Sequence, residues 1–190
     1  MTLQNLHAAL DQRTHNRVLT EIVTFAAGVS FITLLTRLVI HLPWTPVPIT
    51  GQTFGVALMA LIFGRNRAAA VIGGYLAIGA LGAPIFAGSI GGASALAVGP
   101  TLGYLIGMLL AAPVVGALAD LGATKSFFRA FGAAVCGSVI IFTCGLIGLA
   151  HFLPQASLAT ILTAGLWPFL AGDFVKNITA ASLATRISRA

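Results

Sequence analysis

The feature that most constrains this chain is a succession of long apolar segments that carry almost no charge. The first runs from about residue 18 to residue 42, and similar segments follow through the rest of the sequence. About 20 apolar residues in a row are enough for a helix to cross the hydrocarbon core of a bilayer. Charged residues make up 7% of the chain, against about 25% in soluble domains. We therefore expect an integral membrane protein.

The apolar segments predict one membrane domain over residues 1–190, in which residues 18–190 form a bundle of six transmembrane helices. Helices are favoured because lipid offers no partners for backbone polar groups, and alternating short strands typical of a barrel are absent from the sequence. The fold class is therefore an all-α integral membrane protein. The expected helices cover residues 18–42, 53–64, 68–81, 99–118, 131–152 and 157–183, and the second and third are short.

The positions of the charged residues predict the orientation of the bundle. Charges lie near the two termini and in the connections after the second and fourth helices, whereas the other three connections are nearly uncharged. Cytoplasmic loops carry an excess of Lys and Arg, so both termini are predicted to be cytoplasmic. This scattered placement also explains the net charge of +6 without a nucleic-acid partner. The residues are Arg13, Arg17, Arg65, Arg67, Asp120, Lys125, Arg129, Arg186 and Arg189.

Residues 1–17 are open to two interpretations. Three leucines recur at helical spacing there, which suits a short helix on the cytoplasmic membrane surface; the alternative is a disordered cytoplasmic tail. A removable signal peptide is not expected, because this stretch is polar and the apolar segment after it is too long. Arg17 and Glu21 are four residues apart and are predicted to pair. Arg37, near the outer helix end, is expected to extend toward the lipid headgroups.

Other chemistries find little support in the sequence. Cys136 and Cys144 lie in one apolar segment and are interpreted as small apolar residues, and we expect neither a metal nor a cofactor. The glycines do not form a phosphate-binding motif with a lysine. A serine hydrolase would need Ser89 near a base such as His151, and "AGSIG" is only loosely similar to a nucleophile elbow. We therefore expect no enzyme.

The first external connection, residues 41–52, contains three prolines, which restrict its backbone. A stiff connection that carries Thr50 and Gln52 would suit a lid over a pocket. The alternative is a simple connector in which Trp44 anchors the chain at the membrane interface.

The second external connection is rich in glycine between residues 82 and 107. A glycine-rich, non-helical stretch at membrane depth is tolerated only where protein or a cavity covers it, so residues 88–94 can line a site. The glycines after it have a different role, because their four-residue spacing makes one smooth helix face suited to close packing. That face comprises Gly99, Gly103, Gly107 and Ala111.

The segment "PFLAGDFVKN", residues 168–177, places Asp173 and Lys176 inside an apolar helix. A charged residue at the centre of a membrane helix costs about 2.5–3.5 kcal/mol and nearly always faces the bundle interior. Gly172 leaves room beside the pair, and Pro168 is expected to kink the helix. The two side chains share one helix face, so they could satisfy each other. The alternative is a ligand whose carboxylate contacts Lys176 and whose N–H groups contact Asp173.

Three motifs, "VPITGQTFGV" (47–56), "GAPIFAGSIGGASALAVGPTLGYLIG" (82–107) and "PFLAGDFVKN", occur in an order and spacing that resemble the BioY family. This family comprises the biotin-specific substrate-binding (S) components of energy-coupling-factor (ECF) transporters. The resemblance implies a protein of the bacterial inner membrane that captures biotin from outside, in a pocket beneath the first external loop. It also implies a transmembrane coupling (T) component and two cytoplasmic ATPases as partners, and no covalent chemistry.

The resemblance also implies site residues. Asp173 and Lys176 match the acid and base of the family's GDxxK segment, and Tyr104 matches the tyrosine of GPxxGY. Some members carry polar residues where this chain has Ile90 and Leu105, so we expect Ser89, Ser94 or loop amides to replace those contacts. The expected ligand-binding residues are Asp173, Lys176, Tyr104, Phe86, Gly88, Ser89, Gly91, Gly92, Gln52 and Thr50.

Two alternative functions and the position of the docking face stay open at this point. The chain could be an S component for another small vitamin, or a structural membrane protein with an inert ion pair. The face that docks the coupling subunit is also uncertain, because the first helix has only a small-xxx-small pair, Ala26 and Ser30, where S components often have two alanines.

Overall fold

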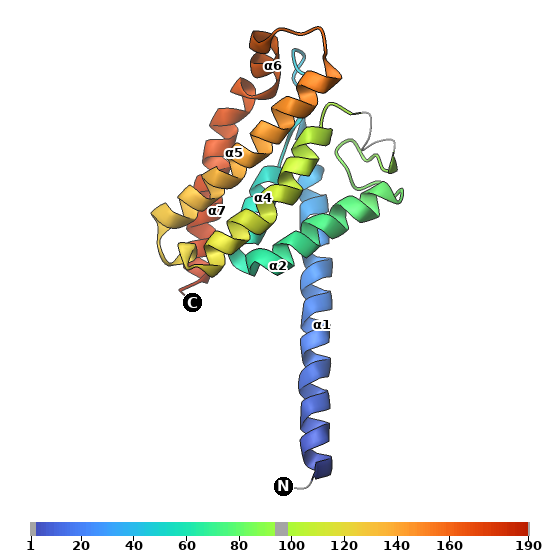
Figure 1. Ribbon diagram of the computed structural model, residues 1–190, viewed down its shortest axis with the longest axis vertical. Helices are drawn as coiled ribbons and strands as arrows, with labels where there is room; N and C mark the ends of the chain where they lie inside the picture. The colour runs from blue at the N-terminus through green and yellow to red at the C-terminus, as the bar shows by residue number, and fades with distance from the viewer. Residues whose placement is uncertain (1–2, 94–98, 190) are drawn as a thin grey trace.

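The computed structural model describes the backbone of residues 3–93 and 99–189, and side chains from residue 16 onward in those ranges. The regular secondary structure of the described chain is helical apart from one short two-stranded ribbon (Figure 1). Five helices in it are long and apolar enough to cross a membrane. These spans are Asn16–Thr36, Gln52–Ala80, Leu102–Asp120, Phe127–Phe152 and Leu158–Ile187. Five such helices are what a multi-pass membrane protein requires, and the structure departs from the predicted helices over residues 52–80 and 158–187.

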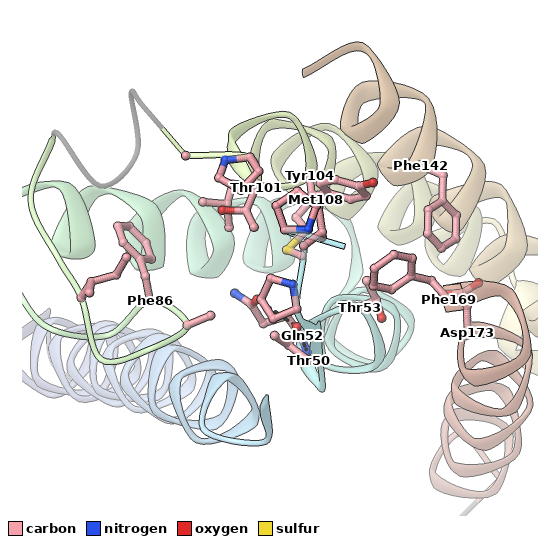
Figure 2. Close-up of a pocket in the computed structure, with 18 of the residues that line it drawn as sticks. Thr50, Gln52, Thr53, Phe86, Thr101, Tyr104, Met108, Phe142, Phe169 and Asp173 are labelled. Carbon is pink, nitrogen blue, oxygen red and sulfur yellow. Dashed lines mark hydrogen bonds between the residues drawn. The ribbon is translucent and has the colours of Figure 1, made fainter. Parts of the chain in front are cut away.

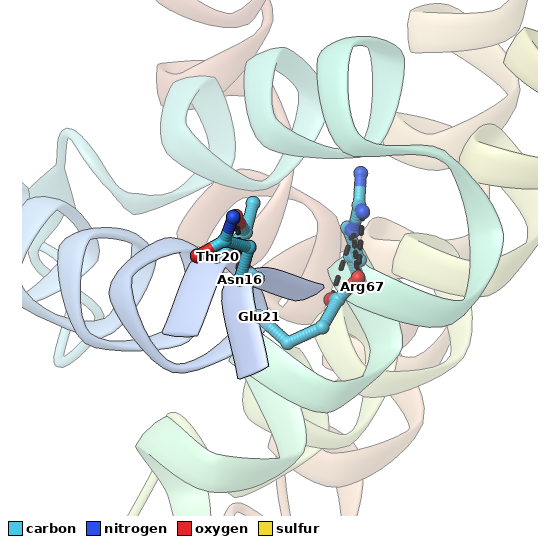
Figure 3. Close-up of polar contacts among 4 residues, drawn as sticks. All are labelled: Asn16, Thr20, Glu21 and Arg67. Atoms are coloured by element: carbon cyan, nitrogen blue, oxygen red, sulfur yellow. Dashed lines mark hydrogen bonds and ion pairs between the residues drawn. The ribbon is translucent and has the colours of Figure 1, made fainter. Parts of the chain in front are cut away.

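Helix α1 (Leu3–Thr36) is continuous and has no break at residue 17. Whether its first turns lie on a membrane surface stays a prediction. Figure 3 shows that Glu21 on α1 pairs with Arg67 on helix α2 (Gln52–Ala80), with Arg67 Nη2 and Glu21 Oε1 2.6 Å apart. The predicted pair with Arg17 is therefore wrong. Both side chains of the observed pair are about half exposed, 47% and 48%, so the pair positions α1 beside α2 and adds little stability.

The first external connection forms a hairpin. Strands β1 (Val39–Ile40) and β2 (Ile49–Thr50) pair antiparallel, with Val39 opposite Thr50. The hairpin loop is tied to the rest of the bundle, because the Thr45 hydroxyl donates a hydrogen bond of 2.6 Å to the carbonyl of Ala164. The ring of Trp44 is 61% exposed. This connection is therefore an anchored structure and not a loose connector.

Helix α2 (Gln52–Ala80) contains a sharp bend at Gly64, where φ is 75° and ψ is −175°. It covers the two helices that we predicted separately, over residues 53–64 and 68–81. Glycine adopts this left-handed conformation without steric cost. Asp120, the last residue of helix α4 (Leu102–Asp120), holds the bend. Its Oδ2 atom accepts a hydrogen bond of 3.0 Å from the backbone N–H of Arg65, a donor that has no partner within the second arm of α2 because it lies at the start of that arm. Figure 1 shows the two arms diverging from this point.

Helix α4 (Leu102–Asp120) packs against α2 and α5 (Phe127–Phe152), and the short helix η1 (Ala123–Lys125) joins α4 to α5. The contact with α5 uses the predicted smooth face. A Cβ atom added to Gly107 would lie 2.7 Å from the Cα of Ile141. One added to Gly103 would lie 2.9 Å from the Cα of Gly148. Glycine is therefore required here because two helix backbones touch.

Gly107→Ala is expected to lower the midpoint of thermal unfolding by roughly 3–10 °C, because α4 and α5 must separate to admit the methyl group. The matched control is Gly132→Ala on α5, where an added Cβ meets open space. That variant should keep the parent midpoint or exceed it slightly, since alanine favours helix. Thermal unfolding in detergent, followed by circular dichroism, measures both. Equal midpoints for the two variants would contradict the contact.

The last predicted helix is divided into α6 (Leu158–Gly165) and α7 (Trp167–Ile187). The division falls at Leu166, with φ −127° and ψ −63°, two residues before Pro168. Proline lacks the N–H that would continue α6, and it fits the first turn of α7. The kink predicted at Pro168 is thus confirmed, as a complete break. Figure 1 places the α2 bend, the α4–α5 connection and the C-terminus at one end of the bundle, and the hairpin at the other.

Candidate functional site

A cavity of about 220 Å³ lies beneath the hairpin, near one end of the bundle. It is smaller than the roughly 300–1,000 Å³ typical of sites for drug-sized ligands, so it suits a small molecule. Figure 2 shows side chains from the hairpin, α2, the loop after α2, α4, α5 and α7 converging on it. Most of the lining is apolar, and Asp173 and Lys176 are its charged members among the described residues.

Asp173 lines this cavity and carries a hydrogen-bond acceptor that the described part of the chain leaves unused. The residue is 7% exposed. Its Oδ2 atom accepts a hydrogen bond of 2.8 Å from Asn177 Nδ2, which also donates to Ser138 Oγ at 2.9 Å. Its Oδ1 atom is buried and has no hydrogen-bond partner within the described part of the chain. Burying an acceptor without a partner is costly, so a donor from a ligand would bind here favourably.

Lys176 also faces the cavity, but it does not pair with Asp173. Its Nζ atom donates to the carbonyl of Thr50 at 2.7 Å and to Thr53 Oγ1 at 3.2 Å. Among the described residues, the one ion pair with its charged atoms within 4.0 Å joins Arg67 to Glu21, and Lys176 and Asp173 form none. The prediction that the two residues satisfy each other is therefore wrong. An ammonium has three donors, so one N–H of Lys176 is left for a further acceptor.

Gln52 and Thr50 line the cavity as predicted, but the amide of Gln52 is already engaged. The Thr50 hydroxyl donates to Gln52 Oε1 at 3.0 Å, and Gln52 Nε2 donates to the Tyr75 hydroxyl at 2.9 Å. That hydroxyl in turn donates to the carbonyl of Ile85 at 3.2 Å. These bonds form a chain from β2 through α2 to the loop after α2, and they fix one side of the cavity.

Tyr104 contributes its ring to the cavity and its hydroxyl to the scaffold. The hydroxyl donates a hydrogen bond of 2.7 Å to the carbonyl of Gly165, at the break between α6 and α7. Its ring centroid lies 6.5 Å from that of Phe142 and 6.4 Å from that of Phe169. The three rings form an aromatic wall, which suits an apolar ring system.

The loop after α2 reaches the cavity through Phe86, Ala87 and Ile90. Phe86 is 4% exposed and packs edge-on against Tyr75, with ring centroids 5.5 Å apart. Ile90 and Leu105 both line the cavity and make its wall apolar. Polar recognition from the described residues therefore depends mainly on Asp173 and Lys176.

Four predicted site residues of this loop are not among those that line the cavity: Gly88, Ser89, Gly91 and Gly92. The glycines shape the loop instead. Gly88 and Gly92 have φ values of 80° and 100°, and the N–H of Gly92 donates to the carbonyl of Gly79 at 2.7 Å. The side chain of Ser89 is exposed. Ser94, which we also considered, lies outside the described residues.

Arg37, which we expected to extend toward the lipid headgroups, is exposed and binds two residues of the loop after α2. Its Nη2 atom donates to the carbonyl of Pro84 at 2.8 Å, and its Nη1 atom donates to Ser89 Oγ. The guanidinium therefore holds the loop after α2.

Several lining residues were missed by sequence reasoning: Thr101, Met108, Phe142 and Phe169. The sequence spacing could have identified two of them. Met108 lies four residues after Tyr104, and Phe169 lies four residues before Asp173, so each shares a helix face with a predicted site residue. Phe142 had none, because its position depends on how α5 packs.

Comparisons with known proteins agree on one family. Residues 5–190 match the model of the BioY family. The chain is 35% identical over 163 residues to the biotin transporter BioY of Thermotoga maritima, covering 86% of this chain and 94% of that protein. It is 34% identical over 180 residues to the biotin transporter BioY of Rhizobium etli, covering 90% and 91%.

A solved structure agrees with these matches. The crystal structure of the S-component for biotin from an ECF-type ABC transporter superposes with a TM-score of 0.83 at 28% identity. The superposition covers 92% of this chain and 94% of the solved chain.

Proposed function

This chain belongs to the BioY family, and we propose that it is the substrate-binding subunit of a biotin uptake transporter. The observation that carries the proposal is the buried Oδ1 atom of Asp173, which has no partner among the described residues, in the wall of a mostly apolar cavity that Lys176 also lines. Biotin has matching chemistry: two ureido N–H donors, a carboxylate at the end of an aliphatic tail, and an apolar bicyclic ring.

In the proposed complex, Asp173 accepts a hydrogen bond from the ureido group of biotin. Lys176 gives its remaining N–H to the biotin carboxylate, and the opposite charges strengthen that bond. The ring system lies against the aromatic wall of Tyr104, Phe142 and Phe169. This arrangement follows the usual pattern of small-molecule sites, in which a few polar groups orient a ligand that apolar surfaces cover.

We also propose that the protein crosses a bacterial inner membrane six times, with both termini in the cytoplasm. The two arms of α2 then count as separate crossings. The proposal is supported by the clustering of positive residues at the end of the bundle that holds the α2 bend and the α4–α5 connection, as the positive-inside rule requires. The hairpin and the opening of the cavity then face outward.

The partners follow from the family. We propose that a transmembrane coupling component and two cytoplasmic ATPases supply the energy for release, because this chain carries no nucleotide-binding motif. The chain itself catalyses no covalent chemistry in this account and needs no cofactor. Ala26 and Ser30 are exposed on α1 and are available to a neighbouring subunit.

Calorimetric titration of the purified protein with a panel of vitamins tests the proposal. Biotin is expected to bind with one site, and the other vitamins are expected to give no heat. Binding of a different vitamin would make the chain an S component of other specificity. No binding of any vitamin would favour a structural membrane protein.

A further inference from the structure

The last turn of α1 holds the loop that follows α2. Arg37 donates to the carbonyl of Pro84 at 2.8 Å and to Ser89 Oγ. The hydroxyl of its neighbour Thr36, which is fully buried, lies 3.0 Å from the carbonyl of Ile85 and 2.5 Å from that of Thr33, so its one proton serves both acceptors. Arg37, the residue after the end of α1, thus binds two residues of a loop about 50 positions further along the chain, and Thr36, the last residue of α1, contacts a third.

The loop segment held in this way is a tight turn with a strained residue. The N–H of Phe86 donates to the carbonyl of Ile90, and the N–H of Ser89 donates to the carbonyl of Phe86, both at 3.0 Å. Ser89 has a φ of 59°, and no other non-glycine residue in the described chain has a positive φ. Such a conformation persists only where surrounding contacts hold it. The guanidinium of Arg37, which binds the side chain of that residue, is one such contact.

This turn carries one wall of the cavity. Phe86 and Ile90, the residues that close the turn, both line the cavity, whereas Arg37 and Ser89 do not. Arg37 therefore affects the cavity indirectly, because it holds in position the turn that forms one wall.

We propose that Arg37 is a positioning residue for ligand retention, which keeps the Phe86–Ile90 turn closed over the cavity without touching the ligand. The inference rests on the proposed function, because the ligand considered is biotin. Without the two guanidinium bonds, the turn leaves its strained conformation more often, and bound biotin escapes more often. Association is less affected, since the open turn still admits the ligand.

The test measures the dissociation of radiolabelled biotin from the purified full chain after addition of excess unlabelled biotin. Arg37→Met keeps the aliphatic stem and removes both bonds, and it should speed dissociation about tenfold, the effect of losing roughly 1.4 kcal/mol. Arg37→Lys, which can keep one bond, should recover part of this loss. Ser89→Gly removes the hydroxyl and the strain together, and it should have a smaller effect than Arg37→Met. Arg129→Met, at an exposed residue of α5, is the matched control and should dissociate like the parent.

Three outcomes separate the possibilities. If the parent protein does not retain biotin, the proposed function fails, and this inference fails with it. If the parent retains biotin and Arg37→Met releases it at the parent rate, only the positioning role is overturned. Amide hydrogen exchange adds a readout that needs no ligand: residues 84–92 should exchange faster in Arg37→Met than in Arg129→Met, and equal exchange would also overturn the role.

Discussion

Asp173→Asn is expected to weaken biotin binding by about 30- to 100-fold, the effect of losing a hydrogen bond to a charged acceptor. The asparagine oxygen can still accept from Asn177, so the amide nitrogen then occupies the position of the unpartnered Oδ1 atom. That nitrogen is a donor, and it meets the donor N–H groups of the ureido ring. Calorimetric titration with biotin gives the change in the dissociation constant directly.

The same substitution separates binding from folding. It removes a buried negative charge whose Oδ1 atom has no partner in the described chain, so the ligand-free variant should unfold at the parent temperature or above it. Gly172→Ala is the matched control, because an added Cβ meets open space one residue away, and it should bind biotin like the parent. Parent-like affinity in Asp173→Asn would remove this residue from the site.

Lys176→Met is expected to weaken biotin binding by about 10- to 100-fold, because it removes the positive charge opposite the biotin carboxylate and keeps the apolar stem. The variant also loses the bonds to Thr50 and Thr53, so the base of the hairpin is less firmly held. Comparing biotin with its methyl ester isolates the charge. The parent should prefer biotin, and the variant should bind both ligands with similar, weak affinity.

The control for this change is Lys125→Met, at an exposed lysine of the α4–α5 connection, which should keep the parent preference. A Lys176→Met variant that still prefers biotin over its methyl ester would show that the carboxylate is bound elsewhere.

The membrane-spanning part of the fold could be predicted because hydrophobicity and helix length are local properties of the sequence. The break before α7 was also local, since Pro168 lacks the N–H that would continue the preceding helix and fits the first turn of a new one. The bend in α2 could be predicted from the sequence only in part. A glycine at position 64 permits a left-handed conformation, but that conformation is held by the bond between Asp120 and Arg65, two residues that are 55 positions apart in the sequence.

The site divides in the same way. Asp173 and Lys176 stand out because a charge inside an apolar helix needs a reason. The partners of Asp173 do not stand out in this way. Asn177 contacts Ser138 on another helix, and the two residues are 39 positions apart in the sequence. The family resemblance led us to expect that Ser89 and the glycines around it line the pocket. The structure assigns them to loop geometry, and it gives Arg37 a contact that no spacing in the sequence predicts.

The structure of the protein crystallised with biotin would test the central claim most directly. We predict one biotin molecule in the cavity beneath the hairpin, with a ureido nitrogen within about 3.2 Å of Asp173 Oδ1. The carboxylate should lie within the same distance of Lys176 Nζ. Biotin located outside this cavity, or bound in it with Asp173 Oδ1 still lacking a hydrogen-bond donor, would contradict the account.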